Sequence, residues 1–178
     1  MSELVRVHLG CGKVYKDGWV NCDMVKDVKA DKYFDLEVFP WPLPDDYADE
    51  ILLDQVMEHL SNTLRAMEEM HRILKPGGIV RINVPYAKSD CAYQDPTHRK
   101  FFTEKTMDYF LEDSPWNFYS RCRFKKLRAE LTTIDITPSL KLRNLLPFRN
   151  KLRWFLWNMY DGVSFELQKT GAANPNAK

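Results

Sequence analysis

Short runs of apolar residues, each closed by glycine, proline or a carboxylate, recur along this chain. The first run covers residues 4–9 and stops at Gly10, which is the pattern of a short buried strand. Similar patterns predict further strands at residues 19–24, 32–36, 50–54, 79–84, 127–136 and 163–169. Prolines at alternate positions make residues 39–44 a predicted loop.

A helical repeat occupies the middle of the chain. Apolar residues fall three or four positions apart between residues 60 and 74, and Ser61 is placed to cap the helix that they predict. The Pro-Gly-Gly sequence at residues 76–78 is expected to end it. We expect a second helix at residues 103–111 and a third within an insertion at about residues 138–161.

Alternating strands and helices predict an α/β fold with a Rossmann-like, mostly parallel sheet. The 178 residues suffice for one domain with a core, expected to span residues 1–170, followed by a flexible tail at residues 171–178. Hydrophobic residues make up 44% and charged residues 29%, which argues against a disordered chain. No apolar run is long enough to span a membrane and no secretory-signal pattern is present, so we expect a cytoplasmic protein.

Four cysteines are scattered through the sequence without any CxxC pair. Paired cysteines at short, regular spacing are the usual signature of a zinc site or a disulfide framework. The spacing here therefore predicts neither, and no metal ligands are assigned from it.

The net charge of +1 conceals an uneven distribution. Residues 1–120 hold 14 Lys and Arg against 21 Asp and Glu, a balance of −7, whereas residues 121–153 hold 10 against 2, a balance of +8. Within the basic part, residues 149–160 combine cations with leucines and aromatic rings in the pattern of an amphipathic helix. Such a helix could pack on the sheet or in a homodimer interface, or contact an anionic membrane or a phosphate group. No strong signal for nucleic-acid binding is present.

Glycines and polar residues follow five predicted strands. They are Gly10, Cys11 and Gly12, then Asp23, Asp35, Asp54 with Gln55, and Pro85 with Tyr86. Parallel strands bind ligands beyond their carboxyl ends, so these residues are expected at one edge of the sheet. The glycines allow close approach to the backbone, Asp23 can accept both hydroxyls of a ribose, and Asp35 can accept from an adenine amine. A nucleoside-type ligand is therefore predicted, and the lack of a GxGxxG or GxxxxGK[ST] motif disfavours pyrophosphate or triphosphate.

Four stretches carry a family resemblance: VHLGCGK, GWVNCD, DEILLDQVMEHL and HRILKPGGIVRINVP. Over about residues 4–110 the chain resembles class I S-adenosylmethionine-dependent methyltransferases, in particular the type 11-like group with the pattern LGCG…GWxNxD…EHL…LKPGG. The resemblance implies a seven-stranded sheet, for which we expect helices on both faces. It also implies S-adenosylmethionine as cofactor and S-adenosylhomocysteine as product.

The same resemblance implies the cofactor contacts. The glycine loop would hold the cofactor, Asp23 its ribose, and Asp35 with Leu36 its adenine, while Asp54 and Gln55 would line the methionine end. The full implied set is His8, Gly10, Cys11, Gly12, Asp23, Met24, Asp35, Leu36, Asp54 and Gln55.

The chain departs from the family pattern at three places. His8 stands where an acidic residue is frequent, Val14 replaces a third glycine, and residues 13–18 are too few for the usual helix between the first two strands. Helices that often cover the cofactor are therefore missing. An open or weakly binding site is expected, unless a partner or the insertion at residues 138–161 covers it.

Candidate catalytic groups follow the fifth strand, at residues 95–99. His98 is the predicted general base for an acceptor hydroxyl or amine, and Asp95 could orient it. The alternative is that Asp95 shapes a turn and His98 lies at the surface. Glu58 with His59 is expected to bridge loop and helix, and His71 to be a packed helix residue.

The leading hypothesis is methyl transfer from S-adenosylmethionine to an oxygen or nitrogen of a small or carrier-linked acceptor. A non-catalytic module that binds S-adenosylmethionine, or serves interaction alone, is the main alternative. A dinucleotide-dependent enzyme is disfavoured, because the third glycine and the helix after the loop are both absent.

Overall fold

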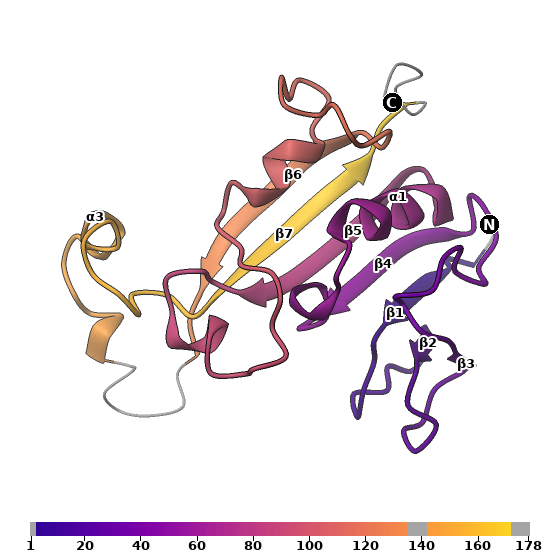
Figure 1. Ribbon diagram of the computed structural model, residues 1–178, viewed down its shortest axis with the longest axis horizontal. Helices are drawn as coiled ribbons and strands as arrows, with labels where there is room; N and C mark the ends of the chain where they lie inside the picture. Colours follow the sequence, from indigo (N-terminus) through magenta and orange to yellow (C-terminus); the bar gives the residue numbers. More distant parts are fainter. Residues whose placement is uncertain (1–2, 135–141, 172–178) are drawn as a thin grey trace.

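The computed structural model describes residues 3–134 and 142–171. Its centre is a seven-stranded sheet with the order β3-β2-β1-β4-β5-β7-β6 (Figure 1). The strands are β1 (Arg6–Leu9), β2 (Val20–Asp23), β3 (Lys32–Tyr33), β4 (Ala48–Asp54), β5 (Leu74–Pro85), β6 (Phe124–Thr132) and β7 (Gly162–Lys169). All seven predicted strands are present, with ends shifted by a few residues.

Strand direction divides the sheet into two parts. The five strands from β3 to β5 run parallel to their neighbours, whereas β7 pairs antiparallel with both β5 and β6. The expected α/β fold with a mostly parallel sheet is therefore confirmed. The carboxyl ends of β1, β2, β4 and β5 meet at one edge, where parallel sheets form their binding crevices.

One face of the sheet carries the core. Register places Val7, Ile51, Val80 and Leu167 in one row across four strands, and all four are fully buried or nearly so. Helix α1 (Thr63–Ile73) packs on this face with its own buried residues Ala66, Met67, Met70 and Ile73 (Figure 1). The 3-10 helices η1 (Met57–His59) and η3 (Thr106–Phe110) contribute to the same core.

The opposite face differs from the expected helical covering. Over β4, β5 and β7 it carries an ion-pair row in which Arg81 contacts both Glu50 and Glu166. The Arg81 side chain is 42% exposed, so water reaches this row. Over β1 the same face is covered by the loop before β2, whose Trp19 packs edge-on against His8. On this face, polar side chains occupy positions that would have to be apolar for a layer of helices to pack there.

Helix α1 begins and ends differently from the prediction. Asn62, not Ser61, caps it, accepting a hydrogen bond from the Arg65 amide at 3.1 Å. The Ser61 hydroxyl instead donates to Glu37 at 2.5 Å, which removes it as a cap. The helix ends at Ile73, and the Pro-Gly-Gly sequence lies inside β5, so the turn into the strand occurs two residues earlier than predicted.

The predicted helix at residues 103–111 is only the 3-10 helix η3. The Thr106 hydroxyl accepts from the Thr103 amide at 2.9 Å, and the buried side chains Met107 and Phe110 lie three residues apart. That spacing matches a 3-10 turn, and the hydroxyl bond offers the backbone an alternative to an α-helix.

The predicted amphipathic helix in the insertion is reduced to α3 (Arg149–Leu152). The Lys88 ammonium takes the carbonyls of Arg153 and Trp154, which a longer helix would need. Phe155, expected on the packed face, is 87% exposed. A short helix without a surface to pack against is unstable in water. Residues 138–141 of the insertion and 172–178 of the predicted tail lie outside the described residues.

Within the described ranges, no helix is long and apolar enough to cross a membrane.

Candidate functional site

The loop after β1 is shaped by two glycines with left-handed backbone. Gly10 has φ +66°, and a Cβ there would lie 2.6 Å from a methyl carbon of Val56. Gly12 has φ +49° with open space around it. Only the first glycine is therefore required by packing, because Val56 fills the space that a side chain would need.

Asp23 joins this loop to the end of β2. One carboxylate oxygen accepts the Gly12 amide at 2.7 Å, and the other accepts the Val25 amide at 2.9 Å. Each oxygen of an ionised carboxylate has room for a second donor, so Asp23 can still accept hydroxyl groups. The predicted closeness of the glycine loop and this carboxylate is a direct contact in the structure.

A cavity of about 470 Å³ lies beside this junction. That volume falls in the range of small-molecule sites. Twelve residues line it: Gly10, Asp23, Met24, Val25, Phe34, Asp35, Leu36, Glu37, Val56, His59, Leu60 and Arg99. The wall thus joins the carboxyl ends of β1 and β2 to the segments that follow β3, β4 and β5.

Five of the ten residues predicted for the cofactor line this cavity: Gly10, Asp23, Met24, Asp35 and Leu36. The other five, His8, Cys11, Gly12, Asp54 and Gln55, are not part of its wall.

These five residues lie around the cavity in different settings. His8 and Cys11 are buried, and burial lowers the pKa of the His8 imidazole and raises that of the Cys11 thiol. Asp54 and Gln55 are exposed at the end of β4. Gln55 has φ +56°, and its amide donates to the carbonyl of Asn83 at 2.9 Å.

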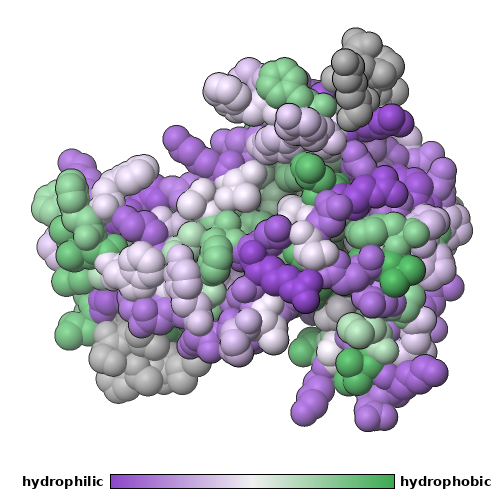
Figure 2. Space-filling model, viewed as in Figure 1, coloured by the Kyte–Doolittle hydropathy of each residue, from purple (hydrophilic) through white to green (hydrophobic). Residues whose placement is uncertain are grey.

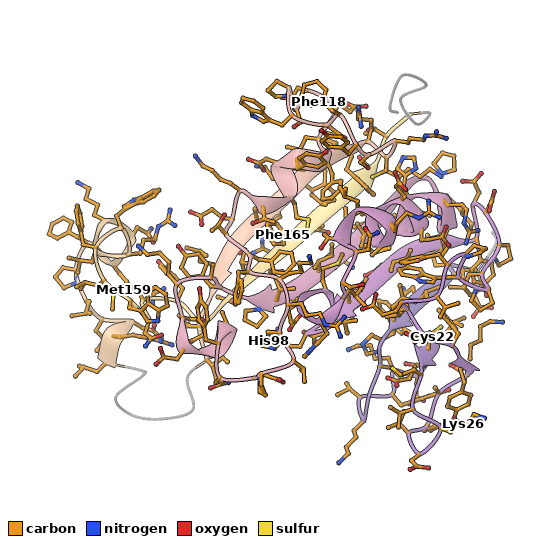
Figure 3. All side chains as sticks on the ribbon, viewed as in Figure 1. Cys22, Lys26, His98, Phe118, Met159 and Phe165 are labelled. Carbon is orange, nitrogen blue, oxygen red and sulfur yellow. The ribbon has the colours of Figure 1, made fainter. Side chains whose placement is uncertain are left out.

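A second polar group adjoins the cavity through His59. The loop at residues 95–100 is tied to η1 by the amides of Arg99 and Lys100, which both donate to the Glu58 carbonyl, at 2.8 and 3.1 Å. This places the His98 ring against His59, with ring centroids 4.8 Å apart. In Figure 3, His98 lies in this loop, close to the carboxyl ends of β4 and β5.

His98 faces two carboxylates. Its Nε2 atom lies 4.0 Å from an oxygen of Glu58 and 4.0 Å from an oxygen of Asp95. Its Nδ1 atom lies 3.0 Å from the carbonyl oxygen of Ala92. The predicted pair of His98 and Asp95 is therefore brought together, but without a hydrogen bond. Asp95 instead accepts from the hydroxyl and amide of Thr97, which hold the pKa of its carboxyl below the usual range.

Glu58 is the group that sequence reasoning undervalued. Its side chain is 1% exposed, and neither carboxylate oxygen has a hydrogen-bond partner among the described residues. Burial raises the pKa of this carboxyl to about 7. A buried carboxylate without donors is costly in a purely structural role. The EHL motif contained this residue, but nothing in the sequence predicted that residues 95–100 would close over it.

Glu37 and Arg99 were also missed as wall residues. The Arg99 guanidinium pairs with the Glu37 carboxylate at 3.2 Å, and this carboxylate also accepts the Ser61 amide at 2.8 Å. The pair crosses from the segment after β3 to the loop after β5. Because it links residues 62 positions apart, local patterns could not predict it.

Residues 142–160 lie beyond the loop after β5. The Trp157 indole donates to Asp90 at 3.0 Å, and Arg153 pairs with Glu104. Leu145, Phe148, Trp154 and Phe155 nevertheless remain 63–87% exposed. Figure 2 shows hydrophobic residues gathered at this end of the molecule. The described part of the insertion therefore does not form the wall of the 470 Å³ cavity.

A family model described as a methyltransferase domain matches residues 20–82, from β2 into β5. A SAM-dependent methyltransferase from Archaeoglobus fulgidus has a TM-score of 0.66 and 20% identity, covering 93% of this chain and 86% of that one. A structure of a complex that contains the Trm112 methyltransferase activator from Haloferax volcanii matches with a TM-score of 0.62 and 14% identity. This match covers 95% of this chain and 84% of that one. The [4+2]-cyclase SpnF matches with a TM-score of 0.59 and 15% identity, over 96% of this chain and 76% of that one. A comparison with curated proteins found no match.

The structural matches define the class of fold, which is the Rossmann-like fold of class I methyltransferases. The domain match covers the wall residues from Asp23 to Leu60, whereas Gly10 and Arg99 lie outside it. Residues 20–82 are therefore similar to a methyltransferase domain, and the fold over most of the chain is similar to that of a SAM-dependent methyltransferase.

Proposed function

We propose that this chain is an S-adenosylmethionine-dependent methyltransferase that acts on an oxygen or nitrogen atom of a small or carrier-linked acceptor. The observation that supports this most directly is the cavity between Gly10, Asp23 and Asp35, with the Glu58, His59 and His98 group at its border. S-adenosylmethionine supplies a methyl group on a positively charged sulfur, so the protein has mainly to bind, align and deprotonate.

The residues around the cavity fit an adenosine. Asp23 has free lone pairs for the ribose hydroxyls, and Asp35 with Leu36 would take the adenine beside the exposed Met24. Gly12 leaves the backbone open, since nothing lies within 4 Å of a Cβ there, whereas Val56 fills the corresponding space at Gly10.

The methionine end of the cofactor would lie toward the remaining predicted residues. They are His8, Cys11, Asp54 and Gln55. Asp54 and Gln55 follow β4 at the carboxyl edge and are open to solvent. His8 and Cys11 are buried, so they would support the loop rather than bind the cofactor through exposed side-chain atoms.

The acceptor would bind on the His59 side of the cavity. His98 is proposed to receive the acceptor's proton, since its Nδ1 atom contacts a carbonyl and its Nε2 atom is directed to the carboxylate side. Asp95 would stabilise the resulting imidazolium from 4.0 Å. Replacing His98 with Gln should then lower the turnover of an ionisable acceptor by about 100-fold or more.

A carrier-linked acceptor is supported by residues 142–157. The Arg153 guanidinium lies 4.8 Å from the centroid of the exposed Trp154 ring, and the Lys151 ammonium lies 5.8 Å from that of the exposed Phe148 ring, so the surface offers apolar and cationic contacts together. An anionic membrane or a phosphate-bearing carrier has the matching chemistry. The Lys88 ammonium, in the segment after β5 that also leads to His98, donates to the carbonyls of Arg153 and Trp154 and so holds this surface.

Calorimetry tests the cofactor assignment. The chain should bind S-adenosylhomocysteine in preference to NAD, and Asp23→Asn should weaken this binding at least tenfold. Asp27→Asn, an exposed carboxylate in the next loop, is the matched control and should bind as the wild type does. Stronger binding of NAD would overturn the proposal.

A methyl-release assay with hydroxyl and amine acceptors then separates an enzyme from a binding module. Transfer supports the proposed function. Binding of S-adenosylhomocysteine without transfer to any acceptor, with or without anionic vesicles, would favour the non-catalytic alternative.

A further inference from the structure

Glu58, His59 and His98 form a cluster whose ligand atoms lie within 4.8 Å of one another. The side chains come from η1 and from the loop after β5, and backbone hydrogen bonds from this loop to the Glu58 carbonyl hold the two segments together. The geometry points to a binding site for a divalent transition-metal ion at this cluster, one that neither the family match nor the proposed cofactor accounts for.

The hydrogen bonds around the two rings determine which nitrogen is free. A carbonyl oxygen can only accept, so the Nδ1 atom of His98 carries its proton toward Ala92, and the lone pair of neutral His98 lies on Nε2. The hydroxyl of Thr97 donates to Asp95 at 2.7 Å, so it accepts from Nδ1 of His59 at 2.9 Å. Both rings therefore hold Nδ1 as a donor and leave Nε2 available, as ligating histidines do.

The carboxylate completes the ligand set. Glu58 is 1% exposed, and within residues 3–134 and 142–171 no donor forms a hydrogen bond to either of its carboxylate oxygens. The free oxygen of Asp95, 4.0 Å from His98 Nε2, is a fourth candidate ligand. A cation would compensate the buried carboxylate, to which the described residues donate no hydrogen bond.

The distances allow the site to close on an ion. Bonds of about 2.1 Å to nitrogen or oxygen require neighbouring ligand atoms to lie about 3.4 Å apart. His98 Nε2 and the Glu58 oxygen are 4.0 Å apart and the three ligand atoms lie within 4.8 Å, so side-chain rotations must bring them closer by about 1 Å. Two imidazoles and a carboxylate suit Zn²⁺, Fe²⁺ or Mn²⁺ and leave a position open for an oxygen of another molecule.

His59 lines the cofactor cavity, so the ion would stand at its border. There it can bind an acceptor hydroxyl and favour release of its proton to solvent; the C–O bond then forms as the methyl–sulfur bond breaks, and the sulfonium becomes a neutral thioether. This role rests on the proposed methyl transfer, whereas ion binding itself does not. With an ion bound, the Nε2 lone pair of His98 is occupied, so the imidazole no longer acts as the base.

Metal binding by the full chain tests the inference without cofactor or acceptor. After treatment with EDTA, the protein is dialysed against Zn²⁺, Mn²⁺ or Mg²⁺, and bound metal and the shift in Tm are measured. We expect about one bound equivalent of Zn²⁺ or Mn²⁺ per chain. Because thiols bind Zn²⁺ much better than Mn²⁺, binding of Mn²⁺ shows that the free cysteines are not the ligands. Glu58→Gln, His59→Gln and His98→Gln should each weaken binding at least about tenfold.

His71→Gln is the matched control, because His71 is a buried histidine of α1 outside the cluster, and it should bind metal as the wild type does. Circular dichroism without metal checks that the variants fold. If the Glu58 and His98 variants do not fold, the variant of the partly exposed His59 still tests the site. Absence of stoichiometric binding, or unchanged binding by the folded cluster variants, would overturn the site. If ions bind but EDTA leaves methyl transfer unchanged, the proposed role of the ion in activating the acceptor is wrong. If the protein does not bind S-adenosylhomocysteine, the proposed function fails, whether or not the ion binds.

Discussion

The amide of Gly12 donates a hydrogen bond of 2.7 Å to the carboxylate of Asp23. This contact ties the loop after β1 to the end of β2, across 11 positions of sequence. It fixes one carboxylate oxygen at the border of the cavity, where the proposed ribose would lie. The glycine loop and Asp23, from which the sequence predicted a nucleoside site, are thus in direct contact.

The two glycines of this loop should respond differently to alanine. Gly10→Ala forces a Cβ to within 2.6 Å of Val56 and adds left-handed strain, so we expect a loss of about 3 kcal/mol in the free energy of unfolding. Gly12→Ala meets no atom within 4 Å and should lose only about 1 kcal/mol. Urea unfolding without ligand measures both.

Val56→Ala provides the control for this comparison. Because the clash is with the Val56 methyl groups, the Gly10→Ala/Val56→Ala double variant should be more stable than the sum of the two single losses predicts. Strictly additive losses would show that the Val56 contact does not cause the effect.

Much of the sheet could be predicted from short apolar runs, because β1, β2 and β4 are short, mostly buried and followed by glycine or polar residues. Asp23 and Asp35 were found for the same reason, since strand ends meet at one edge. Glu58 and Arg99 could not be found this way. Their roles depend on contacts between η1, the segment after β3 and the loop after β5, which no local period records.

Helix prediction failed where packing or side-chain hydrogen bonds decide. Residues 150–160 have the composition of an amphipathic helix, but the Lys88 ammonium takes two of their carbonyls, and Phe155 has no surface to pack on. Ser61 has the chemistry of a cap, but Glu37 holds its hydroxyl. Both outcomes depend on residues distant in the sequence.

Asn62 gives a direct test of the corrected helix start. Asn62→Ala removes the side-chain oxygen that accepts the Arg65 amide, and should lower the free energy of unfolding by about 1 kcal/mol. Asn62→Asp keeps the acceptor and should stay close to the wild type. Equal losses in the two variants would contradict the assignment of the cap.

His71 should make the protein less stable in acid. Burial lowers its pKa in the folded state, where Lys169 lowers it further and Asp46 opposes this. The unfolded chain binds the proton near pH 6.5, so the stability is fully present above that pH and is lost as the pH falls through the lowered folded value. Chemical unfolding at pH 8 and pH 5 should show a smaller decline for His71→Gln.

His8 acts in the same direction, because burial also lowers its pKa, so the His71→Gln variant should retain part of the decline. A variant with the wild-type decline would show that His71 does not contribute.

Vesicle sedimentation tests the surface at residues 142–157. The chain should bind vesicles that contain anionic lipid at low salt and release them at high salt, because the cations beside the aromatic rings are screened. Trp154→Ser/Phe155→Ser should weaken binding at least about tenfold, since each exposed ring contributes buried apolar area. The control Trp116→Ser/Phe118→Ser removes two exposed rings elsewhere and should leave binding unchanged. Failure to bind at either salt excludes a membrane partner.

A crystal structure of the chain with S-adenosylhomocysteine tests the central claim most directly. We expect adenosine in the 470 Å³ cavity, with ribose hydroxyls bonded to Asp23 and the sulfur directed toward His59 and His98. Adenosine bound at another place, or a ribose without contact to Asp23, would contradict it.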